Sequence, residues 1–107
     1  MNKNFAEVDF NNVIGTSFHY GVIYNTAEEI SNVLGTYFTG DKDKVWREWM
    51  RVTDDGTVFT VYDWKDGYVS ETKPLYYHIG THTAEETKKI VEILKEAGLN
   101  ASIDKLF

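Results

Sequence analysis

Hydrophobic and polar residues alternate in two runs that flank an Asp-Gly pair near the middle of the chain. The first run, 46–53, reads Trp-Arg-Glu-Trp-Met-Arg-Val-Thr, and the second, 57–65, reads Thr-Val-Phe-Thr-Val-Tyr-Asp-Trp-Lys. Such runs around Asp-Gly are a strong local signal for a β-hairpin. The pattern therefore predicts two antiparallel strands that turn at Asp55 and Gly56.

Two pairing registers fit this hairpin. A two-residue type I′ turn at Asp55 and Gly56 separates aliphatic side chains from aromatic and charged ones. A three-residue loop over 54–56 instead pairs Thr53 with Thr57 and mixes polar and apolar side chains on one face. Because a slip of one residue moves every side chain across the sheet, we expect the register with the cleaner separation.

In that register the hairpin has an aliphatic face, expected to be core, and an aromatic face that carries arginines. The candidate ligand-binding residues are those of the aromatic face together with a histidine from a later strand: Arg47, Trp49, Arg51, Tyr62, Trp64 and His78. Aromatic rings stack on bases and arginine clamps phosphate, which favours a small nucleotide as ligand. Packing of these residues under a helix or in a dimer contact is the competing interpretation.

The region before the hairpin contains a strand and a short helix. Residues 1–17 are polar and are expected to form an arm or an edge strand. The alternation over 18–24 predicts a strand with Phe18, Tyr20, Val22 and Tyr24 on one face. Gly21 within this strand indicates a bulge or a close approach of another chain.

Two identical Thr-Ala-Glu-Glu strings, at 26–29 and 83–86, have the form of a helix capping box. The first predicts a short helix that ends at Gly35. The second predicts a longer helix that ends at Gly98, because its apolar residues follow the helical period. These residues are Thr87, Ile90, Val91, Leu94 and Ala97.

Residues 75–79 alternate as a strand, and residues 101–107 are expected to add a last short one. The predicted fold is therefore α+β, with a small antiparallel-dominated sheet, two helices on one face, and the order β-α-β-β-β-α(-β). A split β-α-β arrangement, similar to ferredoxin-like folds, is the preferred sketch. The length of 107 residues predicts a single domain over 1–107.

Charge and composition narrow the range of partners. The net charge is −6, from 17 acidic and 11 basic residues, which argues against binding duplex nucleic acid. There are no cysteines, and neither a signal peptide nor a membrane-spanning run is expected, so we expect a cytoplasmic protein without membrane contacts. The many aromatic residues favour a homodimer.

The sequence offers no clear catalytic motif, cofactor motif or metal site. A nucleophile elbow and a phosphate-binding glycine loop are both missing. His78 and His82 are four residues apart, but Ile79 and Gly80 place them at a strand end, so a sheet-face histidine is favoured over a zinc ligand. Asp63 and Glu48 are the carboxylates considered for hydrolysis. We expect a protein that is not an enzyme.

Part of the chain resembles small phage-encoded proteins of undefined role. The resemblance spans about half the chain and includes Ile30–Gly35, Trp49, Asp-Gly-Thr at 55–57, Val-Tyr-Asp-Trp-Lys at 61–65, and Ile79-Gly80. Where those proteins have Trp-His-Ile-Gly-Gly, this chain has Tyr-His-Ile-Gly-Thr at 77–81. The resemblance implies a viral setting and transfers no catalytic residue.

Three functions follow from these features as hypotheses. The first is a non-enzymatic phage-type protein that inhibits a bacterial host defence system, by sequestering a nucleotide signal or by blocking a host protein. The second is an acidic decoy that covers a nucleic-acid-binding surface of a host protein. The aspartates that motivate it are Asp41, Asp43, Asp54, Asp55 and Asp66. The third is a small hydrolase.

Overall fold

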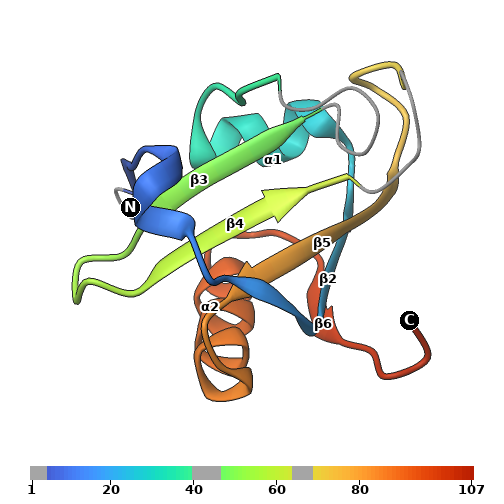
Figure 1. The fold of residues 1–107 in the computed structure, drawn as a ribbon. Coiled ribbons are helices and arrows are strands. Elements are labelled where there is room, and N and C mark those ends of the chain that lie inside the picture. The colour runs from blue at the N-terminus through green and yellow to red at the C-terminus, as the bar shows by residue number, and fades with distance from the viewer. Residues whose placement is uncertain (1–4, 40–46, 64–68) are drawn as a thin grey trace.

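The chain folds into one antiparallel sheet with two helices, which confirms the predicted α+β class (Figure 1). The structure is a computed structural model and describes residues 5–39, 47–63 and 69–107. Within these residues the helices are α1 (Ala27–Leu34), α2 (Ala84–Glu96) and the 3-10 helix η1 (Phe10–Val13). The strands are β1 (Ala6–Glu7), β2 (Ser17–Asn25), β3 (Glu48–Val52), β4 (Val58–Tyr62), β5 (Leu75–Thr81) and β6 (Ala101–Ile103).

The strands lie in the order β1-β3-β4-β5-β2-β6, and each described pair of neighbours is antiparallel. β5 and β6 flank β2 and therefore run parallel to each other. Because α2 connects them, β5-α2-β6 is the split β-α-β unit that was predicted. The strands joined by α1, β2 and β3, run in opposite directions, so the ferredoxin-like sketch holds for one half of the fold. β1 is the expected edge strand.

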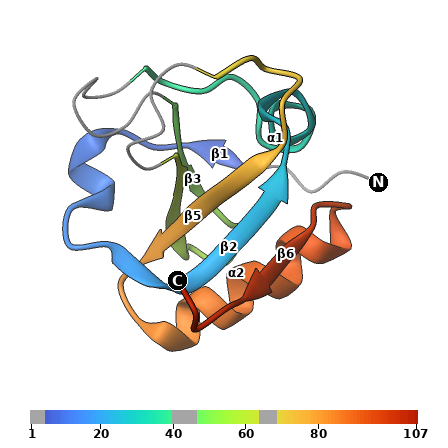
Figure 2. The same cartoon turned by 90° about the vertical axis from the view of Figure 1, so that its right-hand side faces the viewer.

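Both helices pack on one face of the sheet, here called the helix face (Figures 1 and 2). Buried residues of the two helices form one apolar cluster with sheet residues that alternate along the strands. From the sheet these are Ile23, Trp49, Phe59, Val61, Tyr77, Ile79 and Ala101. Neither α1 nor α2 is long and apolar enough to cross a lipid bilayer.

The opposite face, here called the open face, carries η1 and the segment around it at one end. Figure 1 shows this segment in front of the strands while the helices lie behind them. η1 contacts β4, and Val13 and Met50 are both buried. The Nε2 atom of His82 lies 3.0 Å from the carbonyl oxygen of Ile14 and ties the segment to the start of α2. The rest of the open face has no helix over it among the described residues.

α2 follows its sequence prediction closely. Thr87, Ile90, Val91 and Leu94 are its buried residues. Gly98 has a positive φ of 101°, and the N–H of Leu99 donates to Leu94 at 3.0 Å, which closes the helix end. The capping boxes differ, however. Thr26 and Glu29 cap reciprocally, whereas the carboxylate of Glu86 accepts from the backbone N–H of His82.

The hairpin adopts the register that we did not prefer. Trp49 pairs with Val61 and Arg51 pairs with Phe59, so the expected two-residue turn is wrong. The N–H of Thr53 donates to Thr57 at 3.0 Å across a three-residue loop. Among the described turn residues Gly56 alone has a positive φ, of 90°, whereas a type I′ turn needs positive φ at Asp55 as well.

Gly21 marks the bulge that its position indicated, and the element that approaches it is α2 of the same chain. Phe18 pairs with Gly80 and Gly21 pairs with Ile79, so two extra residues bulge out of β2 between them. A Cβ atom at position 21 would lie 2.5 Å from the Cγ2 atom of Thr87 in α2. Real Cβ atoms do not approach that closely, so α2 packs against bare backbone at this point.

Replacing Gly21 with alanine is expected to lower the free energy of unfolding by about 1–3 kcal/mol, through overpacking against Thr87. The substitution Thr87→Ser removes the methyl group that would lie 2.5 Å from the new Cβ atom at position 21. It keeps the hydroxyl oxygen, which lies 2.6 Å from the hydroxyl oxygen of Thr81. Gly21→Ala should therefore cost less in the Thr87→Ser background. A double-mutant cycle by urea unfolding measures this, and an unchanged cost would show that this contact is not the cause.

Candidate functional site

The structure divides the predicted ligand-binding residues between the two faces of the sheet. Arg47, Trp49 and Arg51 are buried on the helix face, with exposed fractions of 4%, 0% and 3%. Tyr62 and His78 lie on the open face. Trp64 lies outside the described residues. The prediction that these residues share one exposed face is therefore wrong, because it depended on the other hairpin register.

Trp49 and Arg51 hold the end of α1. The Nε and Nη2 atoms of Arg51 donate to the carbonyls of Leu34 at 2.7 Å and Thr36 at 2.6 Å. The indole N–H of Trp49 donates to Gly35 at 2.8 Å. Three consecutive carbonyls at the end of α1 thus accept from β3, where a helix terminus otherwise lacks partners. Both side chains stabilise the fold: Trp49 is fully buried, and Arg51 contributes only to the wall of a pocket that Glu7 and Phe38 also line.

Arg47 has a comparable structural position. Its Nη2 atom donates to the carbonyl of Val69 at 2.6 Å, and its guanidinium lies 5.1 Å from the ring centroid of Tyr37. A buried guanidinium over an aromatic ring is well stabilised. Packing under a helix, the competing interpretation of the sequence, therefore describes Trp49 and Arg51, whereas Arg47 is buried against Tyr37 and Val69.

The open face carries an almost continuous row of aromatic side chains, here called the aromatic surface. It consists of Phe18, Tyr24, Tyr62, Tyr76, His78 and Phe107. His78 is at the centre, stacked on Phe18 with ring centroids 4.4 Å apart and planes at 23°. Tyr62 lies 5.6 Å from His78, so two of the six predicted site residues do meet.

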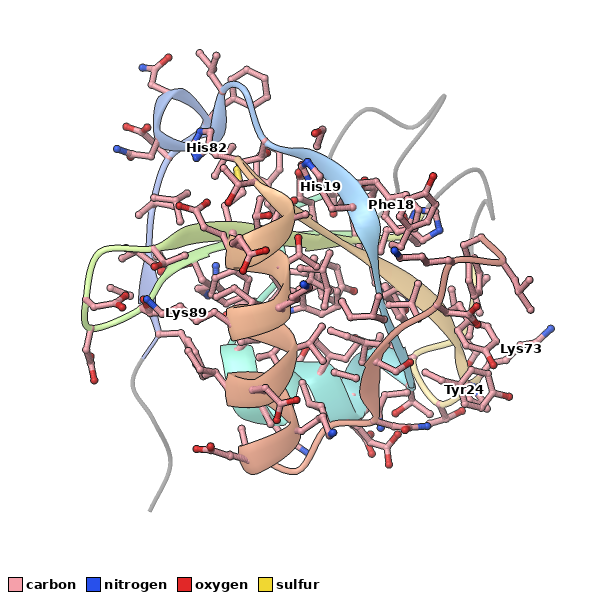
Figure 3. All side chains as sticks on the ribbon, turned by 90° about the horizontal axis from the view of Figure 1, so that it is seen from below. Phe18, His19, Tyr24, Lys73, His82 and Lys89 are labelled. Carbon is pink, nitrogen blue, oxygen red and sulfur yellow. The ribbon has the colours of Figure 1, made fainter. Side chains whose placement is uncertain are left out.

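The row continues along β5 to the far end of β2. Phe107 lies 6.0 Å from His78 and 4.9 Å from Tyr76, and Tyr76 lies 4.6 Å from Tyr24. Tyr24, Tyr76 and Phe107 are 41%, 46% and 44% exposed. Figure 3 shows Phe18 and Tyr24 at opposite ends of β2. Rings from four segments of the chain therefore meet on one solvent-facing sheet surface.

The Tyr62 end of the aromatic surface is acidic. Tyr62 pairs with Glu48 across the hairpin. Burial, and after it the charge of Asp63, raises the pKa of Glu48 above its ordinary value. Burial and the charge of Glu48 likewise raise the pKa of Tyr62. An anionic group would be repelled from this end, so a ligand that carries a phosphate should direct it elsewhere.

The carboxylates and histidines considered for catalysis do not gather at one place. Asp63 is buried on the helix face and accepts from the backbone N–H of Arg47 at 3.2 Å, whereas Glu48 lies on the open face. His82 lies near the start of α2, away from the ring row. Within the described residues no group of three His, Asp or Glu side chains is placed to hold a metal ion.

The aspartates that motivated the decoy hypothesis are only partly described. Asp41, Asp43 and Asp66 lie outside the described residues. Asp55 accepts from Thr57 within the hairpin loop and forms an ion pair with Lys89 of α2. Asp54 is exposed. The acidic decoy therefore stays a prediction.

Comparison of the chain with protein-family models found no match, and comparisons with curated proteins and with solved structures gave no significant match. The candidate site is accordingly argued from its own geometry. The sequence did contain one signal for it, the alternation over 18–24. Phe18 and Tyr24 lie in the ring row as that signal suggested, whereas Tyr20 lies in the bulge of β2. The contribution of Phe107 was missed, because its place beside Tyr76 depends on how the last segment folds back.

Proposed function

We propose that the protein works by stoichiometric binding, and that its aromatic surface stacks against the base of a small nucleotide. The observation that carries this proposal is the ring row on the open face, centred on the stacked pair of Phe18 and His78. Rings at the surface of a sheet, with helices on the other side, form a flat platform for planar ligands.

The size and charge of the protein favour a small ligand over a polymer. Stacking on aromatic side chains contributes about 1–3 kcal/mol per base and tolerates any base. A long nucleic acid also needs many cations along its phosphates, which a chain of net charge −6 does not supply. A nucleotide with few phosphates avoids that repulsion and still uses the rings.

The biological role that fits such binding is the one expected from the phage-type resemblance, inhibition of a bacterial host defence system. A protein that holds a nucleotide signal on its aromatic surface would lower the free concentration of that signal. Blocking of a host protein through the same surface is the other form of this proposal, since exposed tyrosines are frequent anchors in protein interfaces.

Truncation of one ring should weaken nucleotide binding about tenfold to a hundredfold, because a stacking partner is lost. The substitutions are Phe18→Ala and Tyr76→Ala, which lie in two parts of the aromatic surface. Isothermal titration with mononucleotides, linear dinucleotides and cyclic dinucleotides measures the affinity of each variant.

Phe10→Ala is the matched control, since Phe10 is 68% exposed and has no place in the ring row. Its nucleotide affinity should equal that of the wild type. Equal loss in all three variants, or binding that none of them changes, would contradict the assignment of the aromatic surface. No binding of any nucleotide would leave the protein-blocking form, which an affinity capture with the same variants then tests.

A further inference from the structure

A pocket of about 230 Å³ opens beside the bulge of β2, at the Phe18 end of the aromatic surface. Its walls come from β2, from the first turns of α2 and from the segment around β6. The residues that line it include Phe18, His19, Tyr20, Lys88, Ile103 and Lys105. Phe18 belongs both to this pocket and to the aromatic surface, so the two are contiguous.

The bulge that forms one wall holds a strained residue. His19 and Tyr20 are the extra residues of β2, and Tyr20 has a positive φ of 68°. This conformation costs a residue with a Cβ atom about 1–2 kcal/mol, and such strain is found preferentially at functional sites. The carbonyl of Tyr20 accepts from the N–H of Asp104 at 2.8 Å, which fixes the bulge against the segment after β6.

The lining of the pocket is positively charged, although the protein as a whole is acidic. Two cations, Lys88 and Lys105, line the pocket, and none of its described lining residues is acidic. The net charge of the whole chain is −6. Glu85 and Asp104, which lie close to these lysines in the chain, both have partners. Lys88 pairs with Glu85 at 3.5 Å, and the carboxylate of Asp104 accepts from the N–H of Leu106 at 3.0 Å.

The ion pair of Lys88 does not prevent a ligand from using this lysine. Lys88 and Glu85 are 65% and 85% exposed, and exposed pairs of this kind contribute little to stability. The ring of His19 is held in place, since its Nδ1 atom lies 3.0 Å from the carbonyl oxygen of Ser17. Figure 3 shows His19 next to Phe18, near the start of α2.

We propose that this pocket binds the phosphate of the nucleotide whose base lies on the aromatic surface, with Lys88 and Lys105 as its cations. The position of the base in this assignment rests on the proposed function, whereas the position of the phosphate rests on the pocket itself. The pocket is smaller than the roughly 300–1,000 Å³ of sites that enclose a whole drug-sized ligand. It suits a phosphate and its sugar, with the base outside on the rings. Glu48 pairs with Tyr62 on the other side of His78 from Phe18, and its charge favours the same orientation.

The test compares nucleosides with their nucleotides. Adenosine, guanosine and their monophosphates are titrated against the wild type and the double variant Lys88→Gln, Lys105→Gln. The wild type should bind the monophosphates about tenfold or more tightly than the nucleosides, since charge-assisted hydrogen bonds to phosphate are lost without it. The double variant should lose this difference and keep its affinity for nucleosides.

Lys95→Gln is the matched control, because Lys95 lies in the same helix and pairs with Glu92 at 3.7 Å, as Lys88 does with Glu85. It should behave as the wild type. A phosphate advantage that survives in the double variant, or nucleosides that bind as tightly as monophosphates, would overturn the pocket assignment while the proposed function stands.

Titration with pyrophosphate tests the phosphate pocket separately from the binding of a base to the aromatic surface. If neither nucleosides nor monophosphates bind, the nucleotide form of the proposed function fails, and the pocket is then tested with pyrophosphate alone. Amide shifts of His19 and Ile103 in nuclear magnetic resonance spectra of the wild type, missing in the double variant, would support the anion pocket independently. No shift of these amides with pyrophosphate would overturn it as well.

Discussion

Replacing Trp49 with alanine is expected to lower the free energy of unfolding by about 3–5 kcal/mol. The indole is fully buried and packs edge-on against Tyr37 and Tyr77, with ring centroids 5.5 and 5.6 Å away. Its removal leaves a cavity in the core and takes away the hydrogen bond to Gly35. A small domain has a total stability of about 5–15 kcal/mol, so a large part of it would be lost.

Trp49→Phe separates the two contributions, because it keeps an aromatic ring and removes the N–H donor. We expect it to cost about 1–3 kcal/mol, from the lost hydrogen bond to Gly35 and from the smaller ring in a fully buried site. Phe10→Ala, at an exposed aromatic residue, should change stability by less than about 0.5 kcal/mol. Urea unfolding followed by circular dichroism gives all three values. A Trp49→Ala protein as stable as Phe10→Ala would contradict the buried role of Trp49.

The elements with strong local signals were predictable from the sequence. The stripe of α2, its Thr83 cap and its glycine end are contained in a window of 16 residues, 83–98, and they agree with the structure. The alternation of β5 and the bulge at Gly21 were equally local. In each case neighbouring positions alone determine which side chains face the core.

The hairpin register could not be predicted in this way, because the pattern argument placed the arginines on a solvent-exposed face of the sheet. Arg51 lies on the core side since its partners are carbonyls at the end of α1, 17 residues earlier in the chain for Leu34. A pattern of hydrophobic and polar residues cannot show that a charged side chain caps a distant helix. The separation of residue types therefore favoured the wrong turn.

The candidate site was only half predictable for a related reason. Tyr62 and His78 were identified, but the rings that surround them come from β2 and from the last residue of the chain. Their meeting depends on β2 lying between β5 and β6, which is a matter of topology. Local alternation shows which residues share a face, and strand order decides which of those faces adjoin.

Replacing Arg51 with methionine is expected to lower the free energy of unfolding by about 2–4 kcal/mol. Methionine fills a similar volume but has no N–H group to donate. In the wild type the carbonyls of Leu34 and Thr36 accept from Arg51 at 2.7 and 2.6 Å. Hydrogen bonds from charged donors contribute about 1.5–3 kcal/mol each, and buried acceptors without a partner are costly. The loss should appear first as faster hydrogen exchange of the α1 amides, while α2 stays protected.

Two further substitutions distinguish capping of α1 from ion pairing. Arg51 also lies 3.8 Å from Glu7, but Glu7 is 77% exposed, so Glu7→Gln should cost less than about 1 kcal/mol. Arg51→Lys keeps the charge and loses the planar fork, so it should restore only part of the stability. A Glu7→Gln variant as unstable as Arg51→Met would show that the ion pair is the cause of the stability loss.

If instead Arg51→Lys were as stable as the wild type, a single positive charge near the carbonyls would suffice, and the planar guanidinium would not be needed. With the expected result, the guanidinium fork on β3 is what completes the short helix α1. That role explains why a charged residue occupies the core side of the hairpin.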